Sequence, residues 1–176
     1  MEITDNTTVD TITTLHETWV VSFQFYIALF ETGFKSLLRL TNTDTNQGNP
    51  GDRILAIFMD SEDQLLNVVY ELGDTNAWYI HPDKLLAKTW YNLTVRQDFD
   101  RGEFLVRIFI DGEMVEENPN QKHTARKYTN VTVYAGDMHY PPSILGWMDA
   151  LNVTTGKSDT TQVKFYSGLK VDSIFK

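Results

Sequence analysis

The sequence contains no cysteine. This absence excludes disulfide bonds, thiolate metal sites and a cysteine nucleophile, so packing and hydrogen bonds must stabilise the fold. Small secreted domains often depend on disulfides because their cores are small. A chain of 176 residues, 41% of them hydrophobic, can instead bury about 70% of its unfolded surface in one core. We therefore expect a single domain spanning residues 1–176.

Basic clusters and long apolar segments are also scarce. The chain has 15 Lys and Arg against 24 Asp and Glu, which gives a net charge of −9. Nucleic-acid binding needs clustered Lys and Arg, so we expect no nucleic-acid partner, and we interpret the basic residues at 122–127 as a solvated loop. No apolar run reaches the about 20 residues of a membrane helix. The first residues do not resemble a signal peptide, so any such peptide has been removed or never existed.

Helical periodicity is rare, whereas apolar and polar residues alternate along much of the chain. Every second residue from Trp19 to Leu29 is apolar, which is typical of a half-buried strand. The same pattern predicts further strands at residues 36–41, 53–60, 65–72, 90–99, 104–111, 130–136 and 148–155. Only residues 82–88 could hold a turn or two of helix. We expect Trp90 and the odd-numbered residues from Trp19 to Leu29 to be buried.

Polar segments rich in Gly, Asn and Asp separate these strands, at residues 41–52, 60–64, 98–103 and 111–113. The pair Asp111-Gly112 is a strong hairpin signal. Many strands at spacings of about ten residues, joined by such turns, are typical of an all-β sandwich or barrel.

Four segments, in their order along the chain, carry a family resemblance. They are KTWYNLTV (88–95), VRIFIDGEMV (106–115), VTVYAGD (131–137) and GWMDALNV (146–153). Together they resemble the concanavalin A-like jelly roll and, within it, the laminin-G-like modules of extracellular proteins. The resemblance covers residues 15–153 and implies an all-β, two-sheet antiparallel jelly-roll sandwich. The chain departs from the family in one respect, because it lacks the cysteines of the C-terminal disulfide that many laminin-G modules carry.

Catalytic patterns are not recognisable in the sequence. A glycosidase needs two carboxyl groups that face each other across a groove. The nearest acidic candidates, at 60–63 and 111–113, fall at predicted turns, where strand alternation cannot align them. The four histidines are scattered and lack the spacing of a metal site. We therefore expect a protein that is not an enzyme, with a polysaccharide hydrolase or lyase as the less favoured alternative.

Four N-x-T sequons begin at Asn6, Asn92, Asn130 and Asn152. About two would be expected by chance in a chain so rich in Asn and Thr. Strand alternation places the Asn and Thr of the last three on polar faces, where a glycan would displace no core residue. We expect N-glycosylation and a location that is secreted or on the extracellular face of the cell surface. The alternative is a Thr-rich exposed β surface without sugar.

Aromatic side chains in loops form the predicted ligand surface, because an aromatic ring can stack on the apolar face of a sugar. We expect these residues at loop ends: Trp78, Tyr79, His139 and Tyr140. They would alternatively pin their loops to the body of the domain.

A calcium site is implied by the resemblance, since related jelly rolls often hold one Ca²⁺ at the sheet rim. The loop after VTVYAG lies in that region, which makes Asp137 the main candidate ligand. Calcium takes six to eight oxygen ligands, so a second loop must contribute. The candidates there are Asp44, Asp52, Asp60 and Asp63. The alternative is that Asp137 caps a turn or pairs with Arg53.

Two functions therefore remain open. The first is a non-catalytic extracellular recognition module that binds a glycan or a protein partner, with or without calcium. The second is a structural or adhesive domain of a larger secreted or cell-surface protein, which self-associates through an edge strand or a sheet face.

Overall fold

The computed structural model describes residues 7–30, 32–43, 45–120, 125–136, 139, 145–156, 164–166 and 169–171. All regular structure in these ranges is β-strand, and none of it is a helix that could span a membrane. The strands are β1 (Thr7–Leu15), β2 (Trp19–Leu29), β3 (Phe34–Thr41), β4 (Leu55–Asp60), β5 (Leu65–Leu72), β6 (Thr75–Ile80), β7 (Thr89–Asp100), β8 (Glu103–Ile110), β9 (Glu113–Asn120), β10 (Tyr128–Ala135), β11 (Leu145–Thr155), β12 (Lys164–Tyr166) and β13 (Leu169–Val171).

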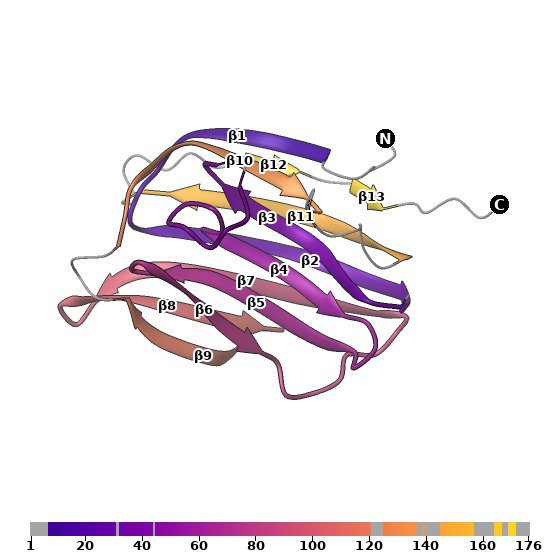
Figure 1. Ribbon diagram of the computed structural model, residues 1–176. Helices are drawn as coiled ribbons and strands as arrows, with labels where there is room; N and C mark the ends of the chain where they lie inside the picture. Colours follow the sequence, from indigo (N-terminus) through magenta and orange to yellow (C-terminus); the bar gives the residue numbers. More distant parts are fainter. Residues whose placement is uncertain are drawn as a thin grey trace.

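These strands form two antiparallel sheets that pack face to face (Figure 1). Sheet A has the order β1-β10-β3-β4-β5-β6. Sheet B has the order β12-β11-β2-β7-β8-β9, and β13 also pairs with β11. Both sheets join strands that are distant in sequence, because β10 lies between β1 and β3, and β2 lies between β11 and β7. The expected two-sheet antiparallel sandwich is confirmed.

The core lies between the sheets, because alternate residues along the strands are apolar and face the opposite sheet. Trp19, Val21, Phe23, Phe25 and Ile27 of β2 are buried, as expected. They belong to one cluster with apolar side chains of sheet A, among them Leu38, Leu40, Ile57, Val68 and Tyr70. Burying one such large apolar side chain stabilises the fold by about 1.5–3 kcal/mol, which lets the domain dispense with disulfides.

Two burial predictions are wrong. Trp90 is 49% exposed because it pairs with Tyr26 on the outer face of sheet B, whereas Leu93 and Val95 of the same strand face the core. Leu29 is 54% exposed because it is the last residue of β2, at the end of the sandwich.

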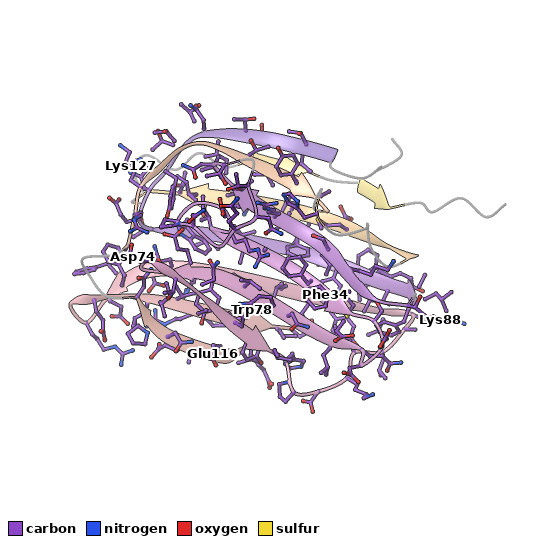
Figure 2. The ribbon with its side chains drawn as sticks, viewed as in Figure 1. Phe34, Asp74, Trp78, Lys88, Glu116 and Lys127 are labelled. Atoms are coloured by element: carbon purple, nitrogen blue, oxygen red, sulfur yellow. The ribbon has the colours of Figure 1, made fainter. Side chains whose placement is uncertain are left out.

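All eight predicted strands are present. The described residues contain five further strands that the sequence did not predict: β1, β6, β9, β12 and β13. Residues 82–88 contain bends and a turn rather than helix. This segment connects β6, at one edge of sheet A, to β7 in sheet B, so it closes one end of the sandwich. Lys88, its last residue, is labelled at that end in Figure 2.

Candidate functional site

A groove of about 410 Å³ opens at this end of the sandwich. One wall is the segment after β6, with His81, Asp83, Lys84, Leu85 and Leu86. The other comprises Tyr91 of β7 and four residues of the β8–β9 hairpin: Ile110, Asp111, Glu113 and Val115. The groove therefore depends on packing between segments about thirty residues apart in the sequence.

The hairpin wall is built on a two-residue turn. Asp111 and Gly112 both have positive φ, at 51° and 85°, as the tight hairpin turn that matches strand twist requires. The Asp111 amide donates to the carbonyl of Asn92 at 2.9 Å. Its Oδ1 accepts two hydrogen bonds from Asn92, from the backbone N at 2.8 Å and from Nδ2 at 3.1 Å. These contacts fix an exposed carboxylate at the groove.

The opposite wall is held by one buried leucine and by two hydrogen bonds that backbone amides donate. Leu85 is buried in the core, and its amide donates to the carbonyl of Gln64 at 2.9 Å. The Leu86 amide donates to the Tyr91 hydroxyl at 2.7 Å, which ties the two walls together. Because Leu85 points inward, the neighbouring Leu86 is 64% exposed and presents an apolar surface.

A buried tyrosine holds the histidine of the groove. The Tyr79 hydroxyl lies 3.0 Å from Nδ1 of His81, and the rings pack at 6.2 Å. Burial raises the pKa of Tyr79, and the negative charges of Glu116 and Asp83 raise it further, so its hydroxyl stays protonated at neutral pH. Tyr79 thus serves the groove indirectly, by positioning His81.

The groove has a net negative charge, since three carboxylates (Asp83, Asp111 and Glu113) share it with the single ammonium of Lys84. Ionised carboxylates only accept hydrogen bonds. The site can therefore receive hydroxyl or ammonium donors beside an apolar surface, and it disfavours anions.

Two of the four predicted ligand residues, Trp78 and Tyr79, do not share one surface. Trp78 and Tyr79 lie within β6 rather than at loop ends, and alternation sends them to opposite faces of sheet A. Trp78 is half exposed on the outer face, where it stacks on Phe58 with ring centroids 6.5 Å apart. Figure 2 labels it on β6. His139 is exposed, and Tyr140 lies outside the described residues.

The candidate calcium ligands that the structure describes, Asp52, Asp60 and Asp63, lie at two separate places. Asp52 precedes β4, while Asp60 ends this strand, which is about 17 Å long, so the two cannot share one ion. Asp60 Oδ1 accepts hydrogen bonds from the amides of Glu62 and Asp63, which makes it the anchor of a turn. Asp44 and Asp137 lie outside the described residues. Within those residues, no three His, Cys, Asp or Glu side chains are arranged to hold a metal.

Asp52 already has four hydrogen-bond donors. Its carboxylate accepts bonds from the Thr43 hydroxyl, from the Thr45 hydroxyl at 2.6 Å, and from the amides of Gln47 and Asn49 at 2.9 and 3.0 Å. Burial alone would raise the pKa of Asp52, but these four bonds outweigh burial and lower it to about 2. This carboxylate therefore organises the β3–β4 loop.

The sequons differ in accessibility. Asn92 and Asn130 are exposed, whereas Asn152 is half-buried and its buried Oδ1 has no hydrogen-bond partner among the residues that the structure describes. Asn6 lies outside those ranges. The apolar neighbours Leu93, Val131 and Leu151 are buried, so each of the three described Asn side chains lies on the solvent side of its strand, as the alternation predicts.

Sequence reasoning missed most of the groove. Asp111-Gly112 was assigned correctly to a hairpin turn, but a turn signal does not show which segment packs beside it. The strand β6 was not predicted, because its sequence TNAWYI has no regular alternation of apolar and polar residues. Without β6, the segment 81–86 could not be placed against the hairpin.

No protein-family model matches this sequence, and no curated protein matches it significantly. The structure is similar to a heptameric SAP-like pentraxin from Limulus polyphemus, with a TM-score of 0.58 and 12% identity over 86% of this chain and 70% of that one. It is also similar to an endo-β-1,4-glucuronan lyase from the fungus Trichoderma reesei, with a TM-score of 0.55 and 14% identity over 84% of this chain and 72% of that one.

A third similar structure is the CBM40 domain of the Ruminococcus gnavus IT-sialidase bound to α2,3 sialyllactose. Its TM-score is 0.51 and its identity 12%, over 82% of this chain and 88% of that one. At such low identities the likeness establishes the fold alone. The chain is a jelly-roll sandwich of the concanavalin A-like kind.

Proposed function

We propose that this chain is a non-catalytic, extracellular, laminin-G-like recognition module that binds a neutral glycan in the groove between residues 81–86 and the β8–β9 hairpin. One observation carries the proposal: a groove of about 410 Å³ combines the fixed carboxylate of Asp111 with the exposed apolar side chain of Leu86. That volume falls within the range of about 300–1,000 Å³ that is typical of small-ligand sites.

The chemistry of a sugar suits both walls. Sugar hydroxyls are donors for Asp83, Asp111 and Glu113, and the C–H face of a pyranose can pack on Leu86. A hydrogen bond to a charged group contributes about 1.5–3 kcal/mol. Two proteins with similar structures support a glycan partner for this fold: the CBM40 domain binds α2,3 sialyllactose, and botulinum neurotoxin type C depends on interaction with two ganglioside molecules for cell entry. The net negative charge of this groove favours a neutral sugar instead.

A binding role suits Asp111 better than a catalytic one. Its Oδ1 accepts two hydrogen bonds from Asn92, which hold the carboxylate in one place as an acceptor for the hydroxyl groups of a ligand. A polysaccharide lyase or hydrolase stays the less favoured alternative, because one structurally similar protein is a glucuronan lyase.

A glycan array, followed by calorimetry on the glycans that bind, tests this proposal. Asp111→Asn removes the charge but keeps an oxygen that can accept from Asn92, and we expect affinity to fall at least about tenfold. Leu86→Ala should also weaken binding.

The matched control is Glu103→Gln, which replaces an exposed carboxylate at the far end of the β7–β8 hairpin. Unchanged affinity in both groove variants would refute the site, and release of reducing or unsaturated sugar ends would refute the non-catalytic role.

A second candidate function is assembly through an edge strand, and the position and composition of β6 favour it. This strand ends sheet A and contains neither a charged residue nor a proline. The corresponding edge of sheet B, β9, carries Glu113, Glu116, Glu117 and Pro119, which are the residue types that discourage strand pairing. An unprotected edge can accept a strand from a second copy of the chain, as a structural or adhesive domain would require.

A further inference from the structure

The outer face of β7 carries an exposed aromatic ring two residues before a sequon. Trp90, Asn92 and Thr94 all point away from the core, because Tyr91, Leu93 and Val95 point toward it. The Trp90 indole is half exposed and packs against the ring of Tyr26 on this face, with ring centroids 5.4 Å apart. Alternate residues of a strand lie about 6.6 Å apart on one face, a spacing comparable to the width of a pyranose ring.

The side chain of Asn92 is held in one orientation. Its Oδ1 accepts from Nε2 of Gln24 at 2.9 Å, and its Nδ2 donates to Asp111 Oδ1 at 3.1 Å. Gln24 lies directly opposite Asn92 on β2, and Tyr26 lies directly opposite Trp90. A group attached to Nδ2 would project from this outer face, which also carries the indole two residues earlier on β7.

We propose that Asn92 carries an N-linked glycan whose first sugar packs on the exposed ring of Trp90. In the modification, Nδ2 forms a bond to C1 of a sugar supplied as a lipid-linked oligosaccharide diphosphate. The bond between C1 and the diphosphate oxygen breaks, the lipid diphosphate leaves, and Nδ2 loses one hydrogen as a proton. The second amide hydrogen remains and can still donate to Asp111.

The other described sequons lack this arrangement. Two residues before Asn130 is Tyr128, which is buried and whose hydroxyl donates to Glu71. Two residues before Asn152 is Ala150, which offers no ring, and the buried Oδ1 of Asn152 leaves its amide less accessible. Among the three sequons within the described ranges, only the one at Asn92 has an exposed aromatic ring at this position.

Packing on Trp90 gives the glycan a structural role. A half-exposed indole is a large apolar surface in water, and the C–H face of a sugar would cover it. Because Asp111 contacts Asn92 and also lines the groove, the glycan would stand at the groove rim. The inference does not depend on glycan recognition by the groove, since it concerns a sugar covalently attached to Asn92 on the outer face of β7.

The experiment compares the same chain made in two hosts: a eukaryotic secretory host that glycosylates it, and a bacterial cytosol that does not. Because the chain has no cysteine, the two products do not differ in disulfides. Mass spectrometry of peptides gives the occupancy of each sequon. The glycans are trimmed enzymatically to one residual sugar, and the difference in Tm between the two products measures the effect of the glycans.

We expect Asn92 to be occupied. We also expect Thr94→Val, which removes only this sequon, to reduce the difference in Tm between the hosts by about 2–4 °C. Trp90→Ala should reduce it equally while leaving Asn92 occupied, and Trp90→Leu serves the same purpose if the alanine variant is not secreted. Thr132→Val, which removes the Asn130 sequon, should leave the difference unchanged. An unoccupied Asn92, or a difference that survives Trp90→Ala or Trp90→Leu, would overturn the proposal.

Discussion

Asp52 is bound through its backbone by the fully buried Arg39. The Asp52 carbonyl accepts hydrogen bonds from Nε of Arg39 at 3.1 Å and from Nη2 at 2.8 Å. The Asp52 carboxylate is thereby left free to bind the Thr43, Thr45, Gln47 and Asn49 donors of the β3–β4 loop. Asp52 thus joins the β3–β4 loop, through its carboxylate, to Arg39 on the outer face of β3, through its carbonyl.

Replacing Asp52 with alanine should destabilise the domain. The substitution removes the acceptor of four hydrogen bonds, and we expect the free energy of unfolding to fall by about 2 kcal/mol, since the exposed donors can partly rebind water. Urea unfolding measures the change. Asp60→Ala, which removes an acceptor in an exposed turn, should cost less than half as much, and equal losses in the two variants would contradict the role of Asp52.

The same carboxylate predicts a dependence of stability on pH. The folded pKa of Asp52 is about 2, below its ordinary value of 3.8, so its ionised form stabilises the folded state. That contribution, about 2 kcal/mol, is complete above about pH 4 and is lost as the pH falls through about 2. Arg107 lowers the pKa of Asp100 and Glu117 through hydrogen bonds, so they act in the same direction. Asp52→Asn isolates one residue: its unfolding free energy should fall less steeply below pH 4 than that of the wild type.

The calcium site at Asp137 stays a prediction, because Asp137 lies outside the described residues. The preceding residue, Gly136, donates to the carbonyl of Leu37 at 3.0 Å, and Leu37 lies opposite residues 57 and 58 of β4, which are closer along the chain to Asp60 than to Asp52. We therefore expect the second loop to be residues 60–63. Added Ca²⁺ should raise Tm, because an ion at 100 times its Kd stabilises the folded state by about 2.7 kcal/mol.

Thermal unfolding with and without millimolar Ca²⁺ tests this placement. Asp137→Ala and Asp60→Ala should each abolish the shift in Tm, whereas Asp52→Asn should lower Tm but preserve the shift. A wild-type Tm that does not respond to calcium would remove the site from consideration.

The fold was predictable where strands have one buried face. β2 and β7 alternate over many residues because one side of each forms the core, and this constraint is visible in the sequence. β6 and β9 are edge strands with more solvent contact, so alternation is weak and both were missed. The error at Trp90 was avoidable, because Trp90 shares the parity of Asn92 and Thr94 and not that of Leu93.

The candidate site was harder to predict for a different reason. Its residues come from a connecting segment and a hairpin that meet only after two sheet edges have packed together. Asp111 and Leu86 are unremarkable in sequence, and their proximity depends on the hydrogen bond between Leu86 and Tyr91 and on the buried side chain of Leu85. Such non-local packing is not encoded in any short motif.

The edge strand β6 provides a test of self-association. Ile80 is 53% exposed on this edge, and Ile80→Lys adds the type of charge that protects natural edges. If copies pair through β6, sedimentation of the wild type should show dimers that increase with concentration, and Ile80→Lys should remain monomeric. Met114→Lys on β9, which also replaces an exposed apolar residue at a sheet edge, is the control and should behave like the wild type. A monomeric wild type at high concentration would exclude this mode of assembly.

The charge of the groove predicts selectivity between neutral and acidic sugars. Asp83, Asp111 and Glu113 outnumber Lys84, so a sialylated ligand meets repulsion that its neutral counterpart does not. At low ionic strength we expect the neutral form to bind several times more tightly.

Raising the salt to about 1 M, where the screening length is about 3 Å, should reduce this difference in affinity. The double variant Asp83→Asn with Glu113→Gln should also reduce it, because it removes two negative charges while Asp111 keeps its bonds to Asn92. Calorimetry with matched neutral and sialylated oligosaccharides measures both affinities. A preference for the sialylated form in the wild type would place glycan recognition on another surface of the sandwich.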